Sequence, residues 1–201
     1  MLNFFVLHSC ISGEKLGGGV AIGQCYDPCL PSKLNILKVK EALAKGGNVN
    51  SEDTNGETAL KLAVKYGSAE VVQVLLDSPH VEMNSKTGNP SETPLQLAVR
   101  LGNKTIVQLL INDQRVDVNI ADKECNSPLH DAAKRGHNRI VFLLLNHPQI
   151  KTNYKNKEGQ TPLMSALVQR RALCVRDMLS HPKIDLDTKE KEGRGLKEMA
   201  R

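Results

Sequence analysis

The sequence is poor in aromatic residues: they make up 3% of its 201 residues, and Trp is absent. Enzyme pockets and surfaces that stack nucleic-acid bases usually carry aromatic side chains, so this composition disfavours both. It suits a core built from Leu, Val, Ile and Ala. The apolar share of 40% and the charged share of 24% are typical of a globular chain.

Long apolar runs are also missing. No segment approaches the roughly 18 apolar residues that a membrane-spanning helix needs. A short apolar run near the N-terminus ends at His8, and no basic residue precedes it, unlike the core of a secretory signal. We therefore expect a cytoplasmic or nuclear protein, and export by another route is the alternative.

The cysteines do not form a recognisable framework. They are odd in number and scattered: Cys10, Cys25, Cys29, Cys125 and Cys174. Disulfide scaffolds normally use an even number, so a reducing compartment is expected. Cys25 and Cys29 lie four residues apart, but no second pair or nearby His completes a zinc set. We expect neither a metal nor a cofactor.

The net charge of +5 is modest, and acidic residues alternate with basic ones through most of the chain. Nucleic-acid binding normally shows as a concentrated basic face, so it is not expected here.

The chain repeats itself at a fixed interval. Thr-Ala-Leu-Lys-Leu-Ala at residues 58–63 returns with substitutions at residues 93–98, 127–132 and 161–166, at intervals of 35, 34 and 34. Val-Val-Gln-Val-Leu-Leu at residues 71–76 returns in the same phase at 106–111 and 140–145. Two motifs in phase indicate stacked repeats, in which neighbouring copies supply the core that one copy cannot build alone.

These motifs resemble the ankyrin repeat, whose pattern is Thr-Pro-Leu-His-x-Ala with a period of ~33 residues. The resemblance covers residues 34–201 and implies an all-α solenoid of helix-turn-helix repeats joined by hairpin loops. Ser91 and Cys125 stand where the family's hairpin Gly is expected. Arg170 replaces the Gly that ends the first helix in the other copies.

Local chemistry favours the same helices. Each copy opens with a residue type that caps helix N-termini: Thr58, Thr93, Ser127 and Thr161. In the last three of these copies a Pro follows, and its fixed φ suits the first helical position. In the second copy Leu95, Ala98 and Val99 then share one face, as an amphipathic helix requires.

We expect a flexible tail at residues 1–31 and a repeat domain at residues 32–201. The Gly-rich stretch at residues 17–23 does not predict nucleotide binding, because Ile22 stands where a kinase loop needs Gly and no Walker Lys follows. The predicted copies are residues 34–52 (partial), 53–87, 88–121, 122–155, 156–189 and 190–201 (incomplete). The incomplete copy is either a degenerate cap or a sign that the natural chain continues.

The resemblance implies that hairpin tips and exposed first-helix positions bind a partner protein. The first-helix candidates, carried over by position, are Lys61, Lys65, Tyr66, Gln96, Arg100, Leu101, Lys134, Arg135, Gln169 and Arg170. The hairpin candidates are Asp53, Asn55, Glu57, Asn89, Glu92, Lys123, Glu124, Asn126, Lys157 and Gln160.

Basic residues recur in two adjacent slots of these first helices and predict a basic ridge: Lys65, Arg100, Lys134, Arg135 and Arg170. An acidic or phosphorylated segment of a partner protein would bind along it. The alternative is that a cation late in a helix interacts with the helix dipole, at ~0.3–1 kcal/mol each. Tyr66 and Leu101, beside the ridge, gain nothing from the dipole and fit a binding hot spot.

Two further sets of polar residues have predicted roles. Asn84 and Asn153 each follow a Leu by eight residues, which resembles ankyrin sites modified by an asparaginyl hydroxylase, although Asn also hydrogen-bonds turns. His130 occupies the family's His position, where the resemblance implies a hydrogen bond to the adjoining hairpin. No copy holds a nucleophile and base in a catalytic arrangement, so we expect no catalytic residue.

The sequence therefore predicts a monomeric, non-catalytic protein-interaction module, acting as an adaptor, an inhibitor or a substrate-recruiting scaffold. Two alternatives stay open. The chain is a regulatory segment of a longer enzyme or channel, or it is a secreted effector that acts on host proteins.

Overall fold

The computed structural model describes residues 32–199 as two compact units, one ending at Pro94 and the other beginning at Leu95. Within these residues, helices alternate with loops and isolated β-bridges, and no strand is present. The all-α prediction is therefore confirmed. The flexible tail predicted for residues 1–31, with its three cysteines, lies outside the described residues.

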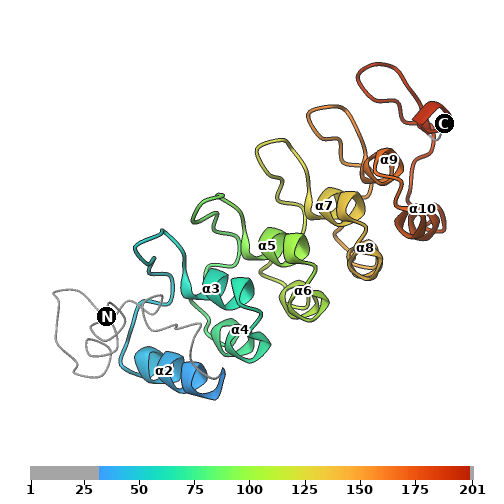
Figure 1. Cartoon of the computed structure of the whole chain (residues 1–201). Coiled ribbons are helices and arrows are strands. Elements are labelled where there is room, and N and C mark those ends of the chain that lie inside the picture. Colours follow the sequence, from blue (N-terminus) through green and yellow to red (C-terminus); the bar gives the residue numbers. More distant parts are fainter. Residues whose placement is uncertain (1–31, 200–201) are drawn as a thin grey trace. The chain divides into compact units, whose positions relative to one another are not determined.

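The first unit contains α2 (Ser32–Ala44), α3 (Ala59–Lys65) and α4 (Ala69–Leu76). Both α2 and α3 pack against α4 (Figure 1). Val39 of α2, Val64 of α3 and Val72 of α4 are completely buried. None of these short helices could bury its apolar side alone, so the helices form the core together.

The second unit contains the remaining helices: α5 (Pro94–Leu101), which starts at the unit boundary, α6 (Lys104–Ile111), α7 (Pro128–Arg135), α8 (Asn138–Leu145), α9 (Pro162–Val168), α10 (Ala172–Leu179) and α11 (Leu196–Met199). Equivalent helices of successive copies stack: α7 on α9, α6 on α8, and α8 on α10. The loops that precede α7 and α9 project on the same side of the helix pairs (Figure 1). Ala132 and Ala166 are completely buried, and their small side chains allow α7 and α9 to approach closely.

The predicted helix ends are present. Thr58 Oγ1 accepts a hydrogen bond from the amide of Lys61 at 3.3 Å. Prolines open α5, α7 and α9, where the missing N–H has no intrahelical partner to lose. Gly136 closes α7 in the left-handed conformation, with φ of 80°. Arg170 takes the equivalent place after α9 with φ of 53°, although it carries a side chain.

The hairpin loops share a left-handed turn residue, and one loop places it differently. Four of them turn through a left-handed residue two places before the helix cap position: Gly56, Cys125, Gly159 and Gly193. Ser91, at the same place in the second hairpin, does not take this conformation. The left-handed residue of its loop is Gly88, with φ of 70°. A Gly three places earlier takes up this conformation without the cost that Ser would meet.

Asparagine side chains join successive copies within each unit. The amide of Asn119 donates to the carbonyl of Gln149 at 2.9 Å, and its oxygen accepts from the amide of Lys151 at 2.8 Å. Asn50 makes the same pair of bonds with His80 and Glu82, each at 2.8 Å. The preceding copy therefore satisfies one carbonyl and one amide in each of these loops.

Candidate functional site

One slot of the first helix is buried in each copy. It holds Lys61, Gln96, His130 and Met164 in turn. His130 Nε2 lies 3.0 Å from the carbonyl oxygen of Gln160, as the resemblance implied. Burial lowers the pKa of His130, so its imidazole is neutral at physiological pH. The slot belongs to the scaffold and is not part of the exposed surface.

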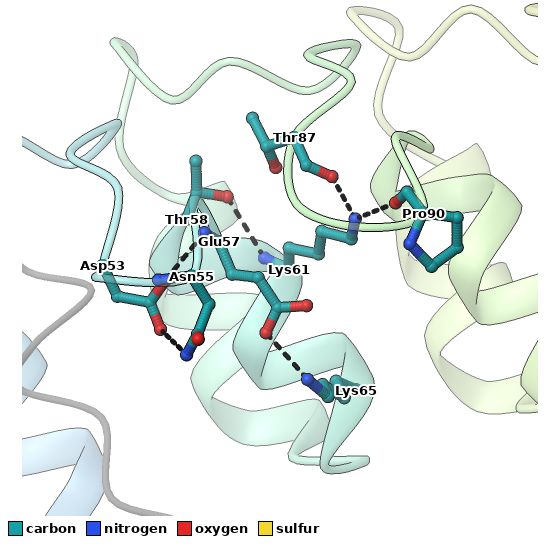
Figure 2. A network of polar contacts seen from close by, with 8 residues as sticks. All are labelled: Asp53, Asn55, Glu57, Thr58, Lys61, Lys65, Thr87 and Pro90. Carbon is teal, nitrogen blue, oxygen red and sulfur yellow. Dashed lines mark hydrogen bonds and ion pairs between the residues drawn. The ribbon is translucent and has the colours of Figure 1, made fainter.

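Two residues of this slot were predicted to be exposed contacts, and this is wrong. Lys61 is 1% exposed, and Gln96 is buried with its side-chain amide donating to the carbonyl of Ile120 at 3.0 Å. Aligning these residues with His130 would have revealed the error, because the resemblance already gave His130 a bond to the hairpin. Figure 2 shows the Lys61 side chain directed toward the backbone of Thr87 and Pro90.

The first-unit member of the predicted ridge is an internal ion pair. Lys65 Nζ lies 2.9 Å from Glu57 Oε2, and the Lys65 side chain is 44% exposed (Figure 2). The hydrogen bond that Lys65 donates to the Glu57 carboxylate raises the pKa of Lys65. Glu57 itself, predicted as a hairpin contact, is buried. The charge of Lys65 is therefore largely balanced by its own copy.

The second-unit members differ from Lys65. Lys134, Arg135 and Arg170 are exposed, and their side chains form no ion pair with the residues that the structure describes. Arg100, in the slot of Lys134, is half-buried. Lys134, Arg135 and Arg170 are therefore available to a ligand, unlike the paired Lys65.

The copy at residues 156–189 departs from the pattern in which basic residues occupy two adjacent slots of the first helix. Arg170 stands in the position of Gly136, and Val168 occupies the slot of Lys134. Val168 is 47% exposed. An apolar group therefore replaces the cation that would have continued the row along α9.

A groove of about 310 Å³ in the second unit is lined by Lys134 and Val168, among other residues. One wall is the first-helix surface, with Lys134 and Val168, and the other is formed by the hairpin loops that precede α7 and α9. The hairpin wall includes Glu124 and Glu158. Glu124 is paired with Lys157 at 3.6 Å. The groove is thus basic and apolar along the helices and mixed in charge along the hairpins.

Both predicted apolar contacts are exposed, each in its own unit. Tyr66 and Leu101 have 47% of their surface accessible. The Lys65 ammonium lies 5.9 Å from the centre of the Tyr66 ring, within range of a cation–π contact. Leu101 ends α5.

Backbone carbonyls near the C-terminal ends of the first helices α5 and α7 are bound by side chains of the copy that follows. The sequence patterns did not indicate this feature. Arg171 Nε donates to the carbonyl of Lys134 at 3.1 Å. The ring of His137 hydrogen-bonds the backbone of Arg100 in the same way. Burial lowers the pKa of His137, and the positive charges of Arg135 and Arg171 lower it further. These contacts satisfy carbonyls that lack intrahelical partners.

The asparagines proposed as hydroxylation sites lie at copy ends. Asn153 donates to the carbonyl of Lys183 at 2.8 Å and accepts from the amide of Asp185 at 2.9 Å. These hydrogen bonds fit the alternative given above, in which the Asn side chain serves the scaffold. Asn84 is exposed. Modification of either residue stays a prediction.

The described part of the chain contains no cluster of His, Cys, Asp or Glu suited to a metal ion. Among residues 32–199, no helix is long and apolar enough to cross a membrane.

Comparison with protein families agrees with this architecture. A family model described as ankyrin repeats (3 copies) matches residues 32–122 and residues 114–190. A search of curated proteins found no match. Since the family matches span well over half of the sequence, and the helices, caps and hairpins follow the same repeat, the chain belongs to the ankyrin-repeat family.

Proposed function

We propose that this chain is a non-catalytic binding module whose second unit holds an acidic, partly apolar segment of a partner protein. Ankyrin repeats are protein-interaction modules in general. The observation that carries the finer proposal is the group of exposed cations without an ion pair among the described residues: Lys134, Arg135 and Arg170. They contrast with Lys65, which is paired with Glu57.

The groove supports a partner of mixed character. Lys134, which lines the groove, attracts a carboxylate or phosphate. Arg135 and Arg170 each follow a lining residue in sequence and offer planar guanidinium groups that bind such anions bidentately. Val168, on the same wall, fits an apolar side chain. Glu158 on the hairpin wall disfavours a uniformly acidic ligand. The partner segment that we expect places its acidic groups toward α7 and its hydrogen-bond donors toward the hairpin wall.

Selection from a random peptide library tests this proposal. Peptides that bind the intact chain should be enriched in acidic residues flanking an apolar one. The triple variant Lys134→Glu, Arg135→Glu, Arg170→Glu should bind them at least about tenfold more weakly, because like charges at an interface cost several kcal/mol. Enrichment of basic or purely apolar peptides would contradict the proposal.

A matched control separates local binding from overall charge. Lys104 and Arg139 are also exposed cations of the second unit, but they belong to the second helices α6 and α8, whereas the groove is lined by residues of the first helices and hairpins. Changing both to Glu should leave peptide affinity nearly unchanged at physiological salt, where the Debye length is about 8 Å. If the control weakens binding as much as the groove variant, net charge and not the groove determines affinity. Circular dichroism melting verifies that each variant is folded.

We also propose a cytoplasmic or nuclear location. The support is that Cys125 and Cys174, the cysteines of the described residues, are free thiols, as is usual in a reducing compartment. Cell fractionation with thiol labelling of the native chain tests it, and recovery from the secreted fraction would overturn it.

A further inference from the structure

An acceptor side chain organises most of the hairpin loops from within. Asp53 Oδ1 accepts the amides of Asn55 and Glu57, both at 2.8 Å. Asp122 and Asn156 do the same in later hairpins, with distances from 2.7 to 3.0 Å. This arrangement is an Asx turn, in which the side chain holds the backbone that follows it.

The hairpin at residues 87–92 cannot be built this way. Gly88 stands at the position of Asp53 and offers no side-chain acceptor. Pro90 stands at the position of Asn55 and has no amide to donate. Its β-bridge joins Thr87 to Glu92, whereas the first hairpin joins Glu52 to Thr58, one residue further apart. The loop therefore follows a different course and needs another organising group.

The ammonium group of Lys61 reaches this loop from the preceding copy. Lys61 Nζ donates to the carbonyl of Thr87 and, at 2.9 Å, to the carbonyl of Pro90 (Figure 2). These two carbonyls flank the turn. A buried ammonium is costly unless acceptors surround it, so the loop backbone and the cation stabilise one another.

The fit between cation and loop is close. A Cβ atom on Gly88 would lie 3.0 Å from Lys61 Nζ and 3.0 Å from Cγ of Glu57. Any larger residue at Gly88 would push the ammonium away from its acceptors. Gly88 also has φ of 70°, which side chains rarely adopt.

We propose that Lys61 is a positioning residue that replaces the missing Asx acceptor and sets the course of the hairpin at residues 87–92. The ammonium holds two carbonyls from outside the loop, whereas Asp53 holds two amides from inside its own. The position of Asn89, at the tip of this loop, then depends on a buried residue of the preceding copy. The role does not rest on the proposed binding function, because it can be measured in the free protein.

Backbone ¹⁵N relaxation of the whole chain tests the role. Lys61→Met should lower the order of the amides between residues 87 and 92 and leave those of the hairpin at 122–127 unchanged. Lys65→Met, the same change four residues later at an exposed ion pair, should leave both loops ordered. Unchanged order at 87–92 in Lys61→Met would overturn the proposal, as would equal disorder in the Lys65 variant.

A hairpin exchange makes the test independent of whether Lys61→Met folds well. Residues 88–91 are replaced by Asp-Thr-Asn-Gly, the sequence at residues 53–56, which restores the internal acceptor. In the native loop, Lys61→Met should raise the equilibrium constant for unfolding about tenfold or more, because hydrogen bonds from a charged donor are lost. In the exchanged loop the loss should be much smaller. An equal loss, or failure to fold, in both backgrounds would show that Lys61 serves only general packing.

Discussion

Replacing Gly159 with Ala should destabilise the protein more than the same change at Gly56. The two glycines occupy equivalent hairpin positions with φ of 77° and 71°. Their surroundings differ. A Cβ on Gly159 would lie 2.8 Å from the backbone nitrogen of Lys191, whereas on Gly56 the nearest atom, Oε2 of Glu52, is 3.6 Å away. The pair therefore separates the cost of backbone conformation from the cost of a clash.

The magnitudes follow from these two contributions. The left-handed conformation costs an Ala about 1–2 kcal/mol, and the reduced freedom of the unfolded chain returns about 0.4–1 kcal/mol. Gly56→Ala should thus lower the free energy of unfolding by about 1 kcal/mol. Gly159→Ala adds an overpacking cost of about 1–3 kcal/mol. The Lys191 amide cannot simply move away, because it donates to the carbonyl of Glu158 at 3.2 Å.

Urea unfolding followed by circular dichroism measures both variants against the unchanged chain. The expected losses are about 1 kcal/mol for Gly56→Ala and about 2–4 kcal/mol for Gly159→Ala, with equal m-values. Equal losses would refute the role of the Lys191 contact. No loss in either variant would refute the left-handed conformation of both hairpins.

Three further predictions concern the scaffold. Because burial lowers the pKa of His130 and His137, the unfolded chain binds protons below pH about 6.5 that the folded chain does not. The free energy of unfolding should therefore fall from pH 7 to 5.5, and a urea midpoint that does not change with pH would contradict this. Arg170→Gly should raise the free energy of unfolding by about 0.5–1 kcal/mol, since Gly adopts the left-handed conformation without strain; a lower melting temperature would count against that conformation. Asn119→Ala removes two hydrogen bonds between copies and should cost about 1–3 kcal/mol in urea unfolding, and a loss near zero would show that water replaces them.

The helices and their ends could be predicted from the sequence because they depend on neighbours within a few residues. Pro128 opens α7 and Gly136 closes it, as local backbone preferences require. The 34- to 35-residue spacing of the motifs also indicated stacking, since no single copy can bury its apolar side. The role of His130 followed from the family resemblance.

The candidate site could be predicted only in part. The sequence placed Lys65 and Lys134 in one slot and gave no reason to separate them. In the structure Lys65 is paired with Glu57, while Lys134 lines an open groove. The ion pair depends on where the fold places the carboxylate of Glu57, which lies in the hairpin eight residues before Lys65.

The amino-acid sequence alone is sufficient to establish the ankyrin repeat, its phase and its helices, because these arise from periodic and local preferences. Tertiary structure was needed to show which carbonyls Lys61 binds and that the loop at residues 87–92 takes its own course. Lys61 meets its acceptors 26 and 29 residues away. Such a contact depends on how two copies stack, and no pattern within one copy contains that information.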